Sequence, residues 1–99
     1  MQDEENAFEA AAREAVDLGN RLADADEASD LWDVADGLLA GAIHYWLYTR
    51  QPCADMACED CEEVRTAGQR LALLRKFIDE SARDSEYFHS PNDYGVGRA

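Results

Sequence analysis

The stretch Asp30 to Pro52, DLWDVADGLLAGAIHYWLYTRQP, contains the most apolar run of this 99-residue chain. Its apolar side chains recur at spacings of three and four, which is typical of a helix. One stripe along it consists of Leu31, Ala35, Leu38, Ala42 and Tyr45. A second stripe beside the first consists of Trp32, Leu39, Ile43 and Trp46. Two adjoining stripes predict a helix that is covered on more than one side, and we expect it to end before Pro52.

Two further helices are expected around this one. Residues 7–22 carry a single apolar stripe, preceded by acidic residues 3–5 at the end where the helix dipole favours anions. Asp26, Ser29 and Asp30 are the candidate N-caps of the second helix.

The start of the third helix has two alternatives. Thr66 and Gln69 match a capping box, which places the start at Thr66, whereas Val64 continues the helical spacing and favours an earlier start. We expect this helix to run to about Tyr87, with a turn at residues 90–93.

The sequence therefore predicts an all-α protein with three main helices, of which the second and third form an antiparallel hairpin. With 99 residues, two prolines and six glycines, the chain suits one helical domain, expected over residues 1–89, followed by a flexible C-terminal tail at residues 90–99. A chain this short offers little cover for the second helix. We therefore expect a homodimer formed through that helix.

The charge of the chain is strongly and unevenly negative. Twenty-two acidic and nine basic side chains give a net charge of −13, and residues 64–78 hold the one basic concentration. This balance opposes binding to nucleic acid or to an anionic membrane, although a solvated acidic surface is its simplest reading. The acidic start lacks the features of a signal peptide, and the apolar run from Gly37 to Tyr48 is too short to span a bilayer. We expect a soluble, cytoplasmic protein.

Three cysteines, Cys53, Cys58 and Cys61, lie within one short acidic connection. Thiolates at this spacing can converge on one zinc ion, with His44 or His89 as the fourth ligand. The alternatives are a disulfide or redox role for Cys58 and Cys61, and plain thiols. We therefore expect no cofactor, with zinc as the one candidate.

The chain shows no pattern that indicates catalysis. Its serines lack the G-x-S-x-G context, no phosphate-binding glycine motif is present, and Glu86 with His89 makes only a single E-x-x-H. We therefore expect no enzymatic activity.

Aromatic side chains crowd the end of the second helix. Tyr45 and Tyr48 share one face and are expected to point outward, whereas Trp46 continues the stripe of Trp32, Leu39 and Ile43 inward. Tyrosine is a favoured interface residue, since it joins a large apolar area to a polar tip. Six residues form the predicted partner-binding set: Tyr45, Tyr48, Asp30, Asp33, Leu31 and Leu38.

The leading hypothesis is a non-enzymatic interaction protein that binds another protein and modulates it, by inhibition in the simplest case. The expected partner has a basic or dimerising surface, as a DNA-binding transcriptional regulator or a nuclease does. The alternative is a structural zinc module built on the cysteine loop.

We predict that the chain does not bind DNA or RNA at physiological salt, because the four basic residues within residues 64–78 are too few to attract phosphates to a chain whose net charge is −13. Electrophoretic mobility-shift titrations with duplex DNA and single-stranded RNA test this. A salt-sensitive shift at micromolar protein would contradict it.

Overall fold

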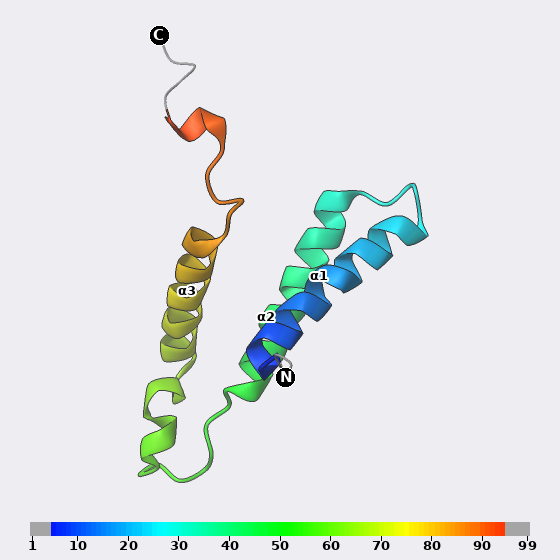
Figure 1. The fold of residues 1–99 in the computed structure, drawn as a ribbon. Helices are drawn as coiled ribbons and strands as arrows, with labels where there is room; N and C mark the ends of the chain where they lie inside the picture. Colours follow the sequence, from blue (N-terminus) through cyan, green and yellow to red (C-terminus); the bar gives the residue numbers. More distant parts are fainter. Residues whose placement is uncertain (1–4, 95–99) are drawn as a thin grey trace. The chain divides into compact units, whose positions relative to one another are not determined.

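The computed structural model describes residues 5–94 and is helical over 73% of them, with no strand in that range. The elements follow one another as α1 (Ala7–Ala25), α2 (Leu31–Thr49), η1 (Glu59–Val64), α3 (Ala67–Asp84) and η2 (Pro91–Tyr94), where η denotes a 3-10 helix. The chain divides into two units, Met1–Thr49 and Arg50–Ala99, each described by itself below. The all-α class with three main helices is confirmed (Figure 1).

The start of α1 is fixed by Asn6, a cap that sequence reasoning did not identify. The Asn6 side chain accepts a hydrogen bond from the Glu9 N–H at 2.7 Å, and the Glu9 carboxylate accepts one from the Asn6 N–H at 3.3 Å. This capping box satisfies two backbone donors that would otherwise lack partners. Arg13 adds ion pairs to Glu5 at 2.8 Å and to Asp17 at 3.5 Å along the exposed face.

A short turn joins α1 to α2, and its hydrogen bonds show which of the three predicted N-caps of α2 is used. Asp26 shapes the turn, because its carboxylate accepts from the Ala28 N–H at 2.9 Å and its carbonyl from the Ser29 N–H at 2.9 Å. Asp30 then caps α2 by accepting from the Trp32 N–H at 2.8 Å. The two helices return side by side as an antiparallel hairpin (Figure 1).

The second unit joins the cysteine connection to α3. The capping box of Thr66 and Gln69 is present, with both hydrogen bonds at 3.1 Å, so α3 starts there. Val64 instead ends the separate 3-10 helix η1, which contacts α3 and whose Val64 carbonyl accepts from Arg70 Nη1 at 2.8 Å. The helix α3 ends at Asp84, three residues before the predicted Tyr87.

The helix pair that the structure describes is not the pair that the sequence predicted. The hairpin that the structure describes consists of α1 and α2, within the first unit. The hairpin predicted for the second and third helices joins residues of different units and stays a prediction, as does the homodimer.

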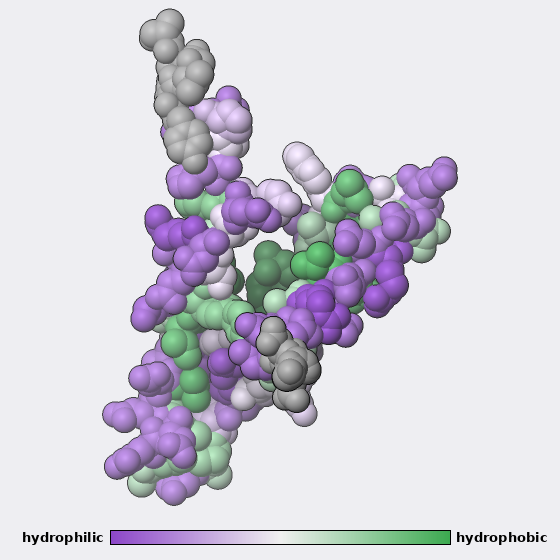
Figure 2. All heavy atoms as spheres, viewed as in Figure 1, coloured by the Kyte–Doolittle hydropathy of each residue, from purple (hydrophilic) through white to green (hydrophobic). Residues whose placement is uncertain are grey.

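Very little of the described chain is buried. Leu74 of α3 is the one buried hydrophobic residue in residues 5–93, and neither helix of the hairpin has a buried residue. Trp32 is 79% exposed and Leu39 is 54% exposed, so the inward orientation predicted for their stripe is wrong for these two residues. A two-helix unit offers α2 one neighbour, and the half-buried residues of α2 are Val34, Leu38, Ile43, Trp46 and Leu47. Figure 2 shows hydrophobic side chains open on the surface beside hydrophilic ones.

The end of the described chain is a single turn of 3-10 helix. Pro91–Tyr94 form η2, where the Ser90 N–H donates to the Asp93 carboxylate at 2.7 Å. Residues 95–99 of the predicted flexible tail lie outside the described residues. Within residues 5–94, no helix has the length and apolar character needed to cross a membrane.

The capping box of α3 can be tested by substituting Thr66, because the two possible starts of this helix predict opposite changes in the free energy of unfolding. Thr66→Ala should lower the free energy of unfolding by about 0.5–2 kcal/mol, because it removes the acceptor for the Gln69 N–H. If the helix began before Thr66, the same change would stabilise the protein, since alanine has the higher helix propensity. Urea unfolding followed by circular dichroism measures the difference, with Thr66→Ser as the control that keeps the hydroxyl.

Candidate functional site

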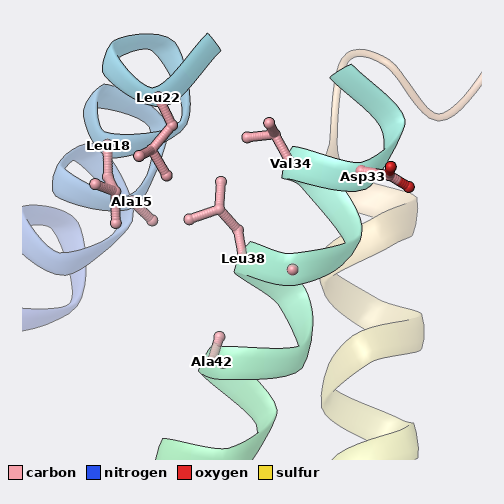
Figure 3. Close-up of a pocket in the computed structure, with 9 residues that line it drawn as sticks. Ala15, Leu18, Leu22, Asp33, Val34, Leu38 and Ala42 are labelled. Atoms are coloured by element: carbon pink, nitrogen blue, oxygen red, sulfur yellow. The ribbon is translucent and has the colours of Figure 1, made fainter. Parts of the chain in front are cut away.

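The hairpin of α1 and α2 carries an open apolar groove of about 510 Å³. In Figure 3, Leu18 and Leu22 of α1 point toward Val34 and Leu38 of α2. The groove is lined by Ala15, Leu18, Leu22, Asp33, Val34, Gly37, Leu38, Gly41 and Ala42. Its surface is almost entirely hydrocarbon, with one carboxylate at the edge.

Three helical glycines shape this groove in two different ways. A Cβ on Gly19 would lie 2.9 Å from Leu38 Cδ1, so the absence of a side chain at Gly19 lets α1 approach α2 closely. A Cβ on Gly37 or Gly41 would meet nothing within 4 Å. Those two glycines therefore leave bare helix backbone at the groove surface, where no side chain of the hairpin packs.

The structure divides the predicted partner-binding set. Asp33 and Leu38 line the groove, and Figure 3 shows the Asp33 carboxylate pointing away from α1. Asp30 serves as the cap of α2, which gives its carboxylate a local structural role. Leu31 is 63% exposed and is not part of the groove lining.

The two tyrosines continue the same side of α2 toward its C-terminus. Gly37, Gly41 and Tyr45 follow one another at spacings of four, and Tyr48 lies three residues further. The Tyr45 and Tyr48 side chains are exposed, and their ring centroids are 6.1 Å apart. Exposure agrees with their predicted outward orientation, and their role in binding stays a prediction. We call Asp33, Gly37, Gly41, Tyr45 and Tyr48 the α2 face.

Gly37 and Gly41 are the members of this face that sequence reasoning missed. A signal for them was present, because G-x-x-x-G inside a helix exposes backbone along one side. Glycine costs a helix interior about 0.5–1 kcal/mol relative to alanine, so two glycines on one face weaken α2 without improving its contact with α1.

The second candidate site is the cysteine cluster, formed by Cys53, Cys58 and Cys61. All three Sγ atoms lie within 4.8 Å of one another, and the sulfurs of Cys53 and Cys61 are 3.6 Å apart. The Cys53 N–H also donates to Cys61 Sγ at 3.3 Å. All three are free thiols, so the structure brings together residues that are up to eight positions apart without a disulfide.

Hydrogen bonding makes the thiols of the cluster inequivalent. The pKa of the Cys53 thiol is lowered, first by a hydrogen bond with the backbone of Asp55 and then by those with the Cys61 and Cys58 side chains. The backbone N–H of Cys53 lowers the pKa of Cys61, but the Cys53 and Cys58 side chains together with desolvation outweigh it and raise that pKa.

Arg65 holds the backbone of the cysteine loop, a role that sequence reasoning missed by grouping Arg65 with the basic residues of the third helix. Its Nη1 donates to the Asp55 carbonyl at 3.3 Å, and its Nη2 donates to the Cys58 carbonyl. Arg65 precedes the start of α3 and lies next to η1. The one signal in the sequence was that Arg65 is the first basic residue after the five acidic residues of the loop, which indicates a contact with the loop.

The two histidines proposed as a fourth metal ligand belong to different units. His44 belongs to α2 in the first unit, so its predicted ligand role stays a prediction. His89 follows α3, where its ring contacts Phe88 with centroids 4.9 Å apart and its Nδ1 lies 3.8 Å from the Asp93 carboxylate.

Comparison of the chain with protein-family models, with curated proteins and with solved structures finds no match.

Proposed function

We propose that this chain is a non-enzymatic binding protein whose α1–α2 hairpin docks an amphipathic, basic helix of another protein. The observation that carries the proposal is the open groove with bare backbone at Gly37 and Gly41. In helix-in-groove recognition, one helix lays its apolar side into such a groove and is positioned by polar contacts at the rim.

The exposed apolar surface of the hairpin supports a docked partner. Leu18, Leu22 and Leu39 are all exposed, although each lies in a helix with apolar periodicity. Burying apolar surface stabilises a complex by about 25 cal/mol per Å² before the costs of association. A second helix seated on Gly37 and Gly41 approaches the α2 backbone more closely than larger side chains would allow.

Charge favours a basic partner. The first 49 residues hold twelve acidic and two basic side chains, and Asp33 lies at the edge of the groove. Positive residues beside the apolar stripe of a partner helix would be attracted by Asp33 and by the net negative charge of this segment. Complementary charge of this kind raises the association rate and discourages acidic partners.

The tyrosines extend the proposed contact beyond the groove. Tyr45 and Tyr48 follow Gly41 on the α2 face, and both rings are exposed. Tyrosine contributes large contact area with few rotatable bonds, which is why it is frequent among interface hot spots. Binding of this kind to a DNA-binding regulator or a nuclease would inhibit it by occupying its basic surface.

A second copy of this chain is the alternative occupant of the α2 face. Such a homodimer would bring together two hairpins that each carry the same strongly negative charge. Like charges oppose this contact, whereas a basic helix relieves them. The basic partner is therefore the proposal, and the homodimer is the competing outcome of the tests below.

The first test titrates the full chain with a tryptophan-free Lys/Leu peptide that forms a basic amphipathic helix. Calorimetry should show 1:1 binding, while a scrambled peptide of the same composition binds more weakly because its apolar residues share no face. Gly41→Leu should weaken binding roughly thirtyfold, since its side chain fills the groove. Leucine also has the higher helix propensity, so this variant should stay folded.

Gly68→Leu is the matched control, because Gly68 lies in α3 and a Cβ there meets only Thr66 Oγ1 at 4.0 Å. Equal binding of both peptides, or of the wild type and Gly41→Leu, would show that charge attraction alone holds the peptide and would refute the docking groove.

Salt provides a second prediction that separates the basic partner from the homodimer. Raising the salt from about 0.1 to 1 M shortens the Debye length from about 10 to 3 Å. Peptide binding should therefore weaken at high salt, and the free chain should sediment as a monomer at both salt concentrations, because screening removes the charge repulsion that would hide a dimer at low salt. A dimer at either salt concentration that Tyr45→Ala or Gly41→Leu dissociates would instead identify a second copy as the occupant.

A further inference from the structure

The cysteine cluster has the dimensions of a metal site rather than of a bonded pair. Zinc binds thiolate sulfur at about 2.3 Å, which places the sulfurs of a tetrahedral site about 3.8 Å apart. The Cys53 and Cys61 sulfurs are 3.6 Å apart, and the Cys58 sulfur lies within 4.8 Å of both. Shifts of about 1 Å would therefore close three thiolates around one ion.

The backbone around the cluster is arranged to keep the sulfurs together. Arg65 joins the carbonyls of Asp55 and Cys58, so one side chain ties the first half of the loop to the segment that enters η1. The Cys53 N–H points at Cys61 Sγ from the opposite end of the loop. An N–H donor stabilises negative charge on a ligating sulfur, and such outer contacts orient metal ligands.

The surroundings of the cluster suit a cation. A polar hollow of about 290 Å³ adjoins Cys58 and is lined by Met56, Ala57, Cys58, Glu59, Glu62 and Arg65. The two glutamates attract a divalent ion to the loop. The Arg65 guanidinium offsets the net negative charge that remains when three thiolates bind one divalent cation.

The loop also lacks an apolar core that could hold it. The segment from Cys53 to Cys61 contains no buried residue, and Met56 is 80% exposed. Small units without a sufficient core are commonly stabilised by a metal or by disulfides. We propose that Cys53, Cys58 and Cys61 bind a thiophilic divalent cation, zinc in the first instance, which fixes the loop that leads into η1 and α3.

Cobalt(II) is the spectroscopic probe for this site. The full chain, reduced and freed of metal with a chelator, is titrated with cobalt and then with zinc. One equivalent of cobalt should give thiolate-to-cobalt charge-transfer absorption and the visible bands of tetrahedral coordination, and zinc should abolish both. Zinc should also protect all three thiols from alkylation and raise the melting temperature.

Variants distinguish thiolate ligation from attraction of ions by the acidic surface. Cys53→Ser, Cys58→Ser and Cys61→Ser should each weaken zinc binding by more than about 100-fold, since even outer contacts are worth roughly 10–100-fold. The double variant Glu59→Gln with Glu62→Gln should keep the charge-transfer absorption. The helix content from circular dichroism checks that each variant remains folded.

Arg65 serves as a positioning residue in this proposal. Arg65→Ala should weaken zinc binding by about tenfold, because the two carbonyls lose their shared donor. Arg75→Ala is the matched control, because it removes the same charge from an exposed position in α3. His44→Ala should weaken binding less than any cysteine change does, since the three thiols already meet within one unit.

Three outcomes would overturn the proposal. The first is reduced protein whose three thiols are alkylated equally fast with and without zinc. The second is cobalt absorption that survives the cysteine changes but is lost in the glutamate double variant. The third is zinc binding that is lost in His44→Ala but kept in all three cysteine variants, which would move the site away from the three cysteines.

Discussion

The contact between Leu38 and Gly19 sets how closely α1 and α2 approach each other. Because Gly19 has no side chain, Leu38 of α2 reaches the backbone of α1, where a Cβ would lie 2.9 Å from Leu38 Cδ1. Leu18 and Leu22 then lie on the same side of α1 and face Val34 and Leu38 (Figure 3). The hairpin, its groove and the exposed α2 face all depend on this approach.

A pair of helices cannot enclose its own apolar surface. Each helix covers one side of its neighbour, and neither α1 nor α2 contains a buried residue. Local interactions supply much of the order instead, including the capping box of Asn6 with Glu9 and the cap that Asp30 provides. Large exposed hydrophobic patches commonly mark the surface on which a protein binds a partner. This property is the basis of the proposed function.

The second unit also has a small hydrophobic core, and polar and thiol contacts hold its loop. Leu74 is its one buried hydrophobic residue within the described range, and the loop before α3 is held by hydrogen bonds to Arg65 and by contacts among three thiols. Cross-linking these sulfurs through an ion would replace many weak contacts with a few strong ones. The metal proposed for the loop and the partner proposed for the hairpin would thus stabilise two units that each have little core of their own.

The sequence by itself determined the features that depend on neighbours within one or two helical turns. It predicted three main helices and offered the capping box at Thr66 as one of two possible starts of the third, because helical periodicity and capping are local. It also marked Cys53, Cys58 and Cys61 as candidate ligands and Tyr45 and Tyr48 as outward residues. Only the tertiary structure showed that α1 is the neighbour of α2 within its unit, that Trp32 is exposed, and that Arg65 joins two carbonyls of the cysteine loop. Those features depend on which faces meet across a turn or loop, and a stripe of apolar residues does not specify the element that covers it.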